Sequence, residues 1–179
     1  MPQEICSVFI PDLVTASPAQ PPSPYPFPLP LRRDDKWGVG RLPQGLTLHP
    51  VGWLGDSVPT SGPVPNEVVA KLLREYGTGA IFSDGTAGWH DCELCPGPEA
   101  WYPNGQVGPV VSWSGQQHRI YGHGHYLVLH RTRVYMAPAL LLHYVLDHSY
   151  RPPDEFTDAV LHGSFLRASD LQWAEPNPS

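Results

Sequence analysis

Apolar residues recur with the spacing of a helix face in the segment 61–79, "SGPVPNEVVAKLLREYGTG". This stripe consists of Val68, Val69, Leu72, Leu73 and Tyr76. Pro65 suits the first turn of a helix, and Gly77 is placed to end it. The segment therefore predicts an amphipathic helix with one buried face.

Two further helices are predicted towards the C-terminus. Residues 137–150, "APALLLHYVLDHSY", open with Pro138 and are rich in leucine. Residues 152–163, "PPDEFTDAVLHG", begin with two prolines and two acidic residues and end at Gly163. These are common start and stop signals of helices.

Several segments outside the predicted helices have the residue pattern of β-strands. Residues 46–54 indicate a short, mostly buried strand, and residues 107–113 and 118–130 also have strand character. Residues 133–138 follow a tight turn and predict the second arm of a hairpin. Strands grouped between helices, without alternation, predict an α+β fold with a short antiparallel sheet and about three helices.

Composition adds irregular segments to this picture. The 179 residues include 23 prolines and 17 glycines, which predicts a small, loop-rich domain. Seven of the prolines lie within residues 18–30, where they disfavour both helix and central strand. We expect a proline-rich N-terminal arm over residues 1–45, an α+β domain over 46–166 and a tail over 167–179.

Charge narrows the classes of partner. The formal net charge is −6, from 17 acidic and 11 basic residues, so the chain has no electrostatic reason to bind nucleic acid or an anionic membrane. No stretch approaches the roughly 18 apolar residues of a membrane helix, and the N-terminus does not resemble a secretory signal. With only three cysteines, the expectation is a cytoplasmic protein.

Two of these cysteines, Cys92 and Cys95, are separated by two residues in "GWHDCELCPG". Such a pair occurs in redox dithiols, in zinc knuckles, or by chance. A redox pair normally begins a helix, whereas Pro96 and Gly97 interrupt one here. The spacing favours half of a tetrahedral zinc site.

The second half of this site is predicted in the helix over residues 137–150. His143 and His148 form an H-x4-H pair, within the spacing of sites with two Cys and two His ligands. Five residues turn an ideal helix too far for one face, so His148 must lie in a loosened last turn. The alternative to metal binding is that His143 is a buried core histidine and that His148 is a histidine at the helix end. His90 is a competing ligand.

The segment "YMAPALLLHYVLDHSYRPPDEFTDAVL" resembles the C-terminal signature of an uncharacterised bacterial family. Members of that family resemble one another in an "APxLIxHYVxxHxYxPPxEF" block preceded by a Cys-x2-Cys loop. "VGWL", "PTSGPVP" and "GWHDCELCP" are similar to its earlier landmarks, and "FIPDL" to its opening. The resemblance covers residues 51–162 best and implies the grouping of Cys92, Cys95, His143 and His148. It implies no activity.

Four protein ligands describe a closed, structural zinc site, because a catalytic zinc ion keeps a position for water. An enzymatic activity would instead require a second metal at a site with an open position. His123 and His125 would share one face of a strand. With Asp91 or Glu93 as a third ligand, they would form a metal site of two histidines and one carboxylate. The alternative is a solvent-facing histidine pair.

The favoured hypothesis is a zinc-stabilised accessory protein that binds another protein through exposed aromatic residues or its proline-rich arm. The alternative is a hydrolase-type enzyme with a second metal at His123 and His125. A nucleic-acid-binding zinc finger does not fit the acidic balance. Most of the tryptophans and tyrosines are expected in the core, with one or two exposed.

Overall fold

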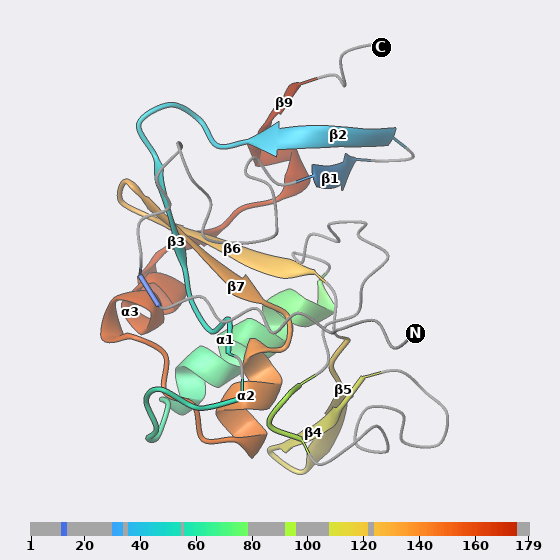
Figure 1. Cartoon of the computed structure of the whole chain (residues 1–179), viewed down its shortest axis with the longest axis vertical. Coiled ribbons are helices and arrows are strands. Elements are labelled where there is room, and N and C mark those ends of the chain that lie inside the picture. Colours follow the sequence, from blue (N-terminus) through green and yellow to red (C-terminus); the bar gives the residue numbers. More distant parts are fainter. Residues whose placement is uncertain are drawn as a thin grey trace.

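A computed structural model describes residues 12–13, 30–33, 36–54, 56–78, 92–95, 108–121 and 124–174 of the chain. The described part contains three α-helices and three small sheets, which confirms the predicted α+β class (Figure 1). No helix in these ranges is long and apolar enough to cross a membrane.

The central sheet has four strands in the order β3–β7–β6–β8. They are β3 (Thr47–Pro50), β7 (Arg133–Pro138), β6 (His125–His130) and β8 (Ser164–Phe165). The predicted hairpin is confirmed, since β6 and β7 pair antiparallel from His130↔Arg133 onwards. β3 pairs with β7 in parallel, so the central sheet is mixed.

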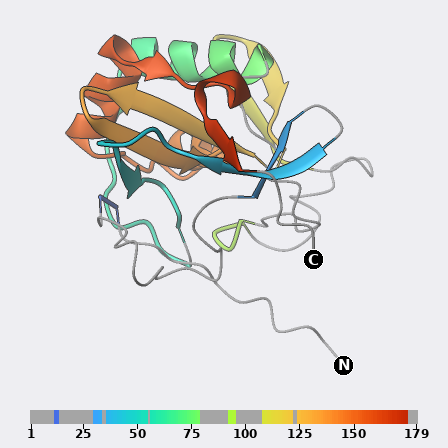
Figure 2. The ribbon, with the colours of Figure 1, turned by 90° about the horizontal axis from the view of Figure 1, so that it is seen from above.

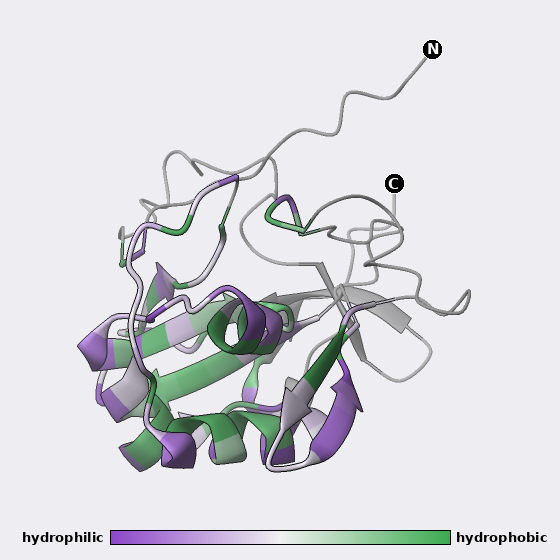
Figure 3. Cartoon of the chain, turned by 90° about the horizontal axis from the view of Figure 1, so that it is seen from below, coloured by the Kyte–Doolittle hydropathy of each residue, from purple (hydrophilic) through white to green (hydrophobic). Residues whose placement is uncertain are grey.

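Three helices share the main core with this sheet: α1 (Asn66–Gly77), α2 (Leu141–Asp147) and α3 (Asp154–His162). Figure 2 shows α1 and α3 lying on the same side of the sheet. The predicted stripe of α1 supplies buried side chains to the core, which Val68 and Leu72 share with Tyr126 of β6 and Phe156 of α3. Figure 3 shows this apolar interior along the strands. Burial of each such side chain stabilises the fold by about 1.5–3 kcal/mol.

Two predicted boundaries were wrong. α2 begins at Leu141, because Pro138 is still the last residue of β7, opposite His125. The predicted strand over 118–130 is divided, and its first part belongs to a separate hairpin of β4 (Val110–Trp113) and β5 (Gln116–Arg119). Gly124 has a φ of +94°, which is incompatible with a continuous strand.

A third sheet joins the two flanking parts of the chain. β1 (Pro30–Arg33), β2 (Lys36–Arg41) and β9 (Gln172–Ala174) pair in the order β1–β2–β9, and η3 (Ala168–Asp170) is a single 3₁₀ turn before β9. β1 and β2 lie within the predicted N-terminal arm, and β9 lies within the predicted C-terminal tail. The domain boundaries at residues 45 and 166 stay a prediction.

The carboxylate of Asp12 accepts two hydrogen bonds from residues at the edge of the core. Its Oδ2 accepts a hydrogen bond from the hydroxyl of buried Tyr150 at 2.6 Å, and its Oδ1 accepts one from the Gly52 N–H at 2.8 Å. Gly52 has a φ of +72°, and a Cβ there would lie 2.6 Å from Leu141 Cδ1. The close approach at this corner therefore requires glycine.

We expect Tyr150→Phe to lower the free energy of unfolding by about 1–3 kcal/mol, since it removes a hydrogen bond to a charged acceptor while keeping the ring. Urea denaturation of Tyr150→Phe, Asp12→Asn and the double variant would measure it. A coupling energy of zero in this double-mutant cycle would show that the contact contributes nothing.

Candidate metal centre

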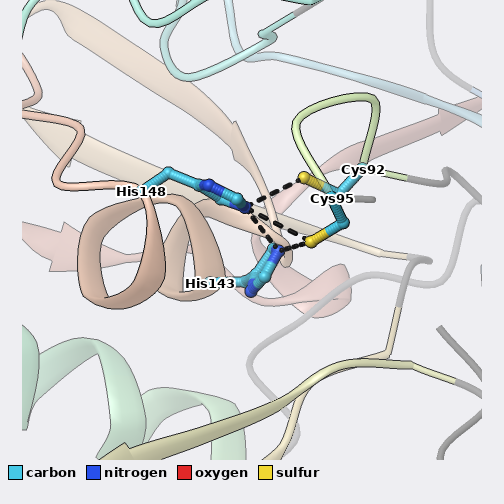
Figure 4. Close-up of side chains that lie close together, drawn as sticks. All are labelled: Cys92, Cys95, His143 and His148. Atoms are coloured by element: carbon cyan, nitrogen blue, oxygen red, sulfur yellow. Dashed lines mark hydrogen bonds between the residues drawn. The ribbon is translucent and has the colours of Figure 1, made fainter. Parts of the chain in front are cut away.

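Cys92 and Cys95 lie on a tight turn beside the end of α2. The Cys95 N–H donates to the Cys92 carbonyl at 3.1 Å, and this bond closes the turn. Cys92 is buried within the main core, with 3% of its surface exposed, whereas Cys95 is half-buried. Figure 4 shows both thiols directed at His143 and His148.

The two histidines converge because the helix ends between them. His143 lies within α2 and is buried, whereas His148 follows its last residue with φ −112° and ψ 6°. The two rings approach edge to face, with centroids 4.7 Å apart. The predicted loosening at His148 is thus confirmed, and Ser149 then takes a φ of +55° as the chain turns away.

The four ligand atoms form one compact group within 4.8 Å of one another. His148 Nε2 lies 3.3 Å from Cys92 Sγ and 3.4 Å from Cys95 Sγ. His143 Nε2 lies 3.2 Å from Cys95 Sγ and 3.1 Å from His148 Nε2. A tetrahedral zinc ion holds two sulfurs and two nitrogens about 3.3–3.8 Å apart, given its usual bond lengths. These four distances are therefore within a few tenths of an ångström of those in a zinc shell.

Asp147 orients one of these ligands. Its Oδ2 lies 2.8 Å from His143 Nδ1, so a carboxylate faces the nitrogen that points away from the thiols. Nδ1 therefore carries the proton and donates it, which leaves the lone pair of Nε2 directed into the group. Carboxylates of this kind commonly support metal-bound histidines.

Burial favours the neutral forms of the four side chains. Desolvation lowers the pKa of His143 and of His148, although the Asp147 carboxylate opposes this in both. Burial, with Cys95 close by, raises the pKa of the Cys92 thiol to about 12, and burial also raises that of Cys95. The neutral imidazoles can therefore ligate a metal directly, whereas the thiols would release their protons to solvent when a metal ion binds.

Asp147 was missed in the sequence, although a signal for it exists. It stands four residues after His143, so on a helix the two side chains meet on one face. A carboxylate one turn after a candidate ligand is the pattern that would have found it.

We expect Asp147→Asn to weaken metal binding by about 10–100-fold while leaving the fold intact, because it removes the charge that orients His143. Competition with a chelator of known affinity would measure the change. Asp56→Asn, at an exposed position between β3 and α1, is the matched control. Equal affinities in both variants would contradict a positioning role for Asp147.

The remaining candidate ligands are His90 and the residues of the predicted second metal site. His90, Asp91 and His123 lie outside the described residues, so the second metal site is not tested, and Glu93 is exposed. His125 is only 4% exposed, and its ring centroid lies 5.1 Å from that of Trp53. The alternative of a solvent-facing histidine pair is therefore wrong for His125.

In the described part of the chain, the four-residue group is the one cluster of histidines, cysteines and carboxylates that could hold a metal ion. Its two sulfurs and two nitrogens would supply the four donors of a tetrahedral shell. Such a shell has no open position for a water molecule, so this arrangement suits a structural metal.

None of the curated proteins and none of the solved structures compared with the chain matches it. A family model does match, over residues 19–161, and its description is a domain of unknown function, DUF7919. The predicted resemblance to an uncharacterised family is thereby confirmed, while its bacterial origin and its motifs stay a prediction. Because the match covers most of the sequence, the chain belongs to the DUF7919 family.

Proposed function

We propose that the metal centre is a structural zinc site and that the protein is an accessory protein that binds another protein. The observation that carries the first part is the convergence of Cys92, Cys95, His143 and His148 within 4.8 Å. Two thiolates with two imidazoles in tetrahedral geometry are typical of zinc. The free thiols fit a reducing compartment, which supports a cytoplasmic location.

The zinc ion would join parts of the chain that are distant in sequence. Residues 96–142 separate the cysteine turn from the first histidine, and the β4–β5 and β6–β7 hairpins form within this interval. Cys92 packs in the same core cluster as Leu142 and Tyr144 of α2. A metal bound by these four residues would hold the 92–95 turn against α2 and so keep Cys92 packed in the core.

We expect one zinc ion per chain in protein purified without a histidine tag. Its removal by a strong chelator should lower the melting temperature, and returning zinc should restore it, because the binding energy of a structural metal is also folding energy. Elemental analysis and thermal melts would measure both. Protein purified without metal would refute the zinc site, and two metals per chain would support the hydrolase-type alternative.

The partner-binding part of the proposal is supported by Tyr121, which is 43% exposed. It is the one exposed large hydrophobic side chain among the residues whose burial the structure describes. Exposed tyrosines are frequent at binding hot spots. Crosslinking in cells should capture a partner with the native chain and lose it with Tyr121→Ala, at unchanged zinc content and melting temperature. Capture that is unaffected by this substitution would exclude Tyr121 from the contact.

A further inference from the structure

The two thiols of the metal centre differ in access. Cys92 is 3% exposed and lies in the core cluster, whereas Cys95 is half-buried and packs against that cluster from its edge. An oxidant from solvent therefore reaches the Cys95 sulfur first. The accessible thiol and the shielded one are neighbours on a single turn.

The turn holds the two sulfurs together by its backbone. The hydrogen bond from the Cys95 N–H to the Cys92 carbonyl is 3.1 Å long and does not depend on a metal. Both sulfurs lie within the 4.8 Å group, and both cysteines are free thiols. A disulfide requires its sulfurs about 2.05 Å apart, so formation of the bond would bring the two free thiols of this turn closer together.

We propose that Cys92 and Cys95 are an oxidation site at which hydroperoxides convert the zinc-bound thiolate pair to a disulfide and release the metal. The proposal rests on the zinc site proposed above and adds its regulation. It assigns Cys95 as the attacking thiol and Cys92 as the resolving thiol.

The chemistry balances with hydrogen peroxide as the oxidant. The Cys95 thiolate attacks one peroxide oxygen, the O–O bond breaks, and hydroxide leaves with a sulfenic acid on Cys95. The Cys92 thiolate then attacks that sulfur, the S–S bond forms, and a second hydroxide leaves. Two thiolates lose two electrons in total, and one peroxide is reduced.

The loss of both thiolates removes half of the metal shell. His143 and His148 alone would hold zinc far more weakly, because structural sites use four ligands. The 92–95 turn would then be detached from α2, while the pairing of Asp147 with His143 could persist without the metal. Reduction with a thiol and return of zinc would restore the closed site.

The test uses the full chain loaded with zinc and treated with hydrogen peroxide. Zinc release is followed with a chromogenic chelator, and peptide mass mapping identifies the oxidised sulfurs. We expect release of one zinc ion per peroxide consumed, a Cys92–Cys95 disulfide with the loss of two hydrogen masses, and recovery on reduction. Asp56→Asn, exposed and distant in sequence, should behave as the native chain does.

Three results would overturn the inference. One is zinc that stays bound while Cys6 or the methionines are oxidised. Another is zinc release with sulfinic or sulfonic acids and no disulfide between the pair. In both cases the zinc site itself would stand. Protein that contains no zinc before peroxide is added would instead refute the proposed function, and the inference would fall with it.

Discussion

Replacement of Cys92 with serine is expected to remove the metal and unfold the chain. Structural zinc sites contribute about 10–16 kcal/mol of apparent binding energy, and a domain is stable by about 5–15 kcal/mol in all. Serine is a poor zinc ligand, and it would also place a hydroxyl in the core cluster that Cys92 shares with Tyr144. Zinc content and far- and near-ultraviolet circular dichroism of the purified variant would measure the loss.

Glu93→Gln is the matched control for this variant. Glu93 stands on the same turn, is exposed, and is not part of the four-residue group. It should keep its zinc and its melting temperature. A Cys92→Ser protein that loses its zinc but keeps native circular dichroism would show that the 92–95 turn does not need a metal to be held.

Replacement of Phe156 with alanine should cost about 3–5 kcal/mol of unfolding free energy, the usual range for a buried aromatic side chain. Phe156 is fully buried and meets the ring of Tyr135 edge to face, with centroids 6.1 Å apart. The ring thus fixes α3 on β7, and its loss leaves a cavity between helix and sheet. Urea denaturation of the zinc-loaded protein would measure the change.

Glu155→Ala tests whether this effect comes from the core. Glu155 precedes Phe156 on α3 and is exposed, so its loss should change the unfolding free energy by at most about 1 kcal/mol through the helix dipole. Similar destabilisation by both substitutions would mean that α3 is sensitive to any change, and that Phe156 has no special role.

The helices were the most predictable part of the fold. α1 has a strong apolar stripe, of which Val68, Val69 and Leu72 are buried, and α3 lies between Pro153 and Gly163 as the sequence indicated. Such signals are local, so a single sequence contains them. The four donor residues were predicted from spacing and from a family resemblance, and the structure brings them together.

The strand partners could not be predicted in the same way. The pattern of residues 47–50 indicates a buried strand but does not say that β7 lies beside it in parallel. β1, β2 and β9 are short, and β9 pairs with residues more than a hundred positions away. Pairing of this kind depends on the assembled core, because strand propensity is set largely by tertiary context.

The parallel pairing of β3 with β7 also affects how the protein is made. β3 ends at Pro50, and in the described part of the chain its ladder partner is β7, which begins at Arg133. At about 5–20 residues per second, the ribosome needs about 4–17 s to synthesise the chain between the two strands. During that interval β3 is an unpaired edge that can pair wrongly with other chains. The yield of folded protein should therefore depend on the speed of translation through residues 51–132.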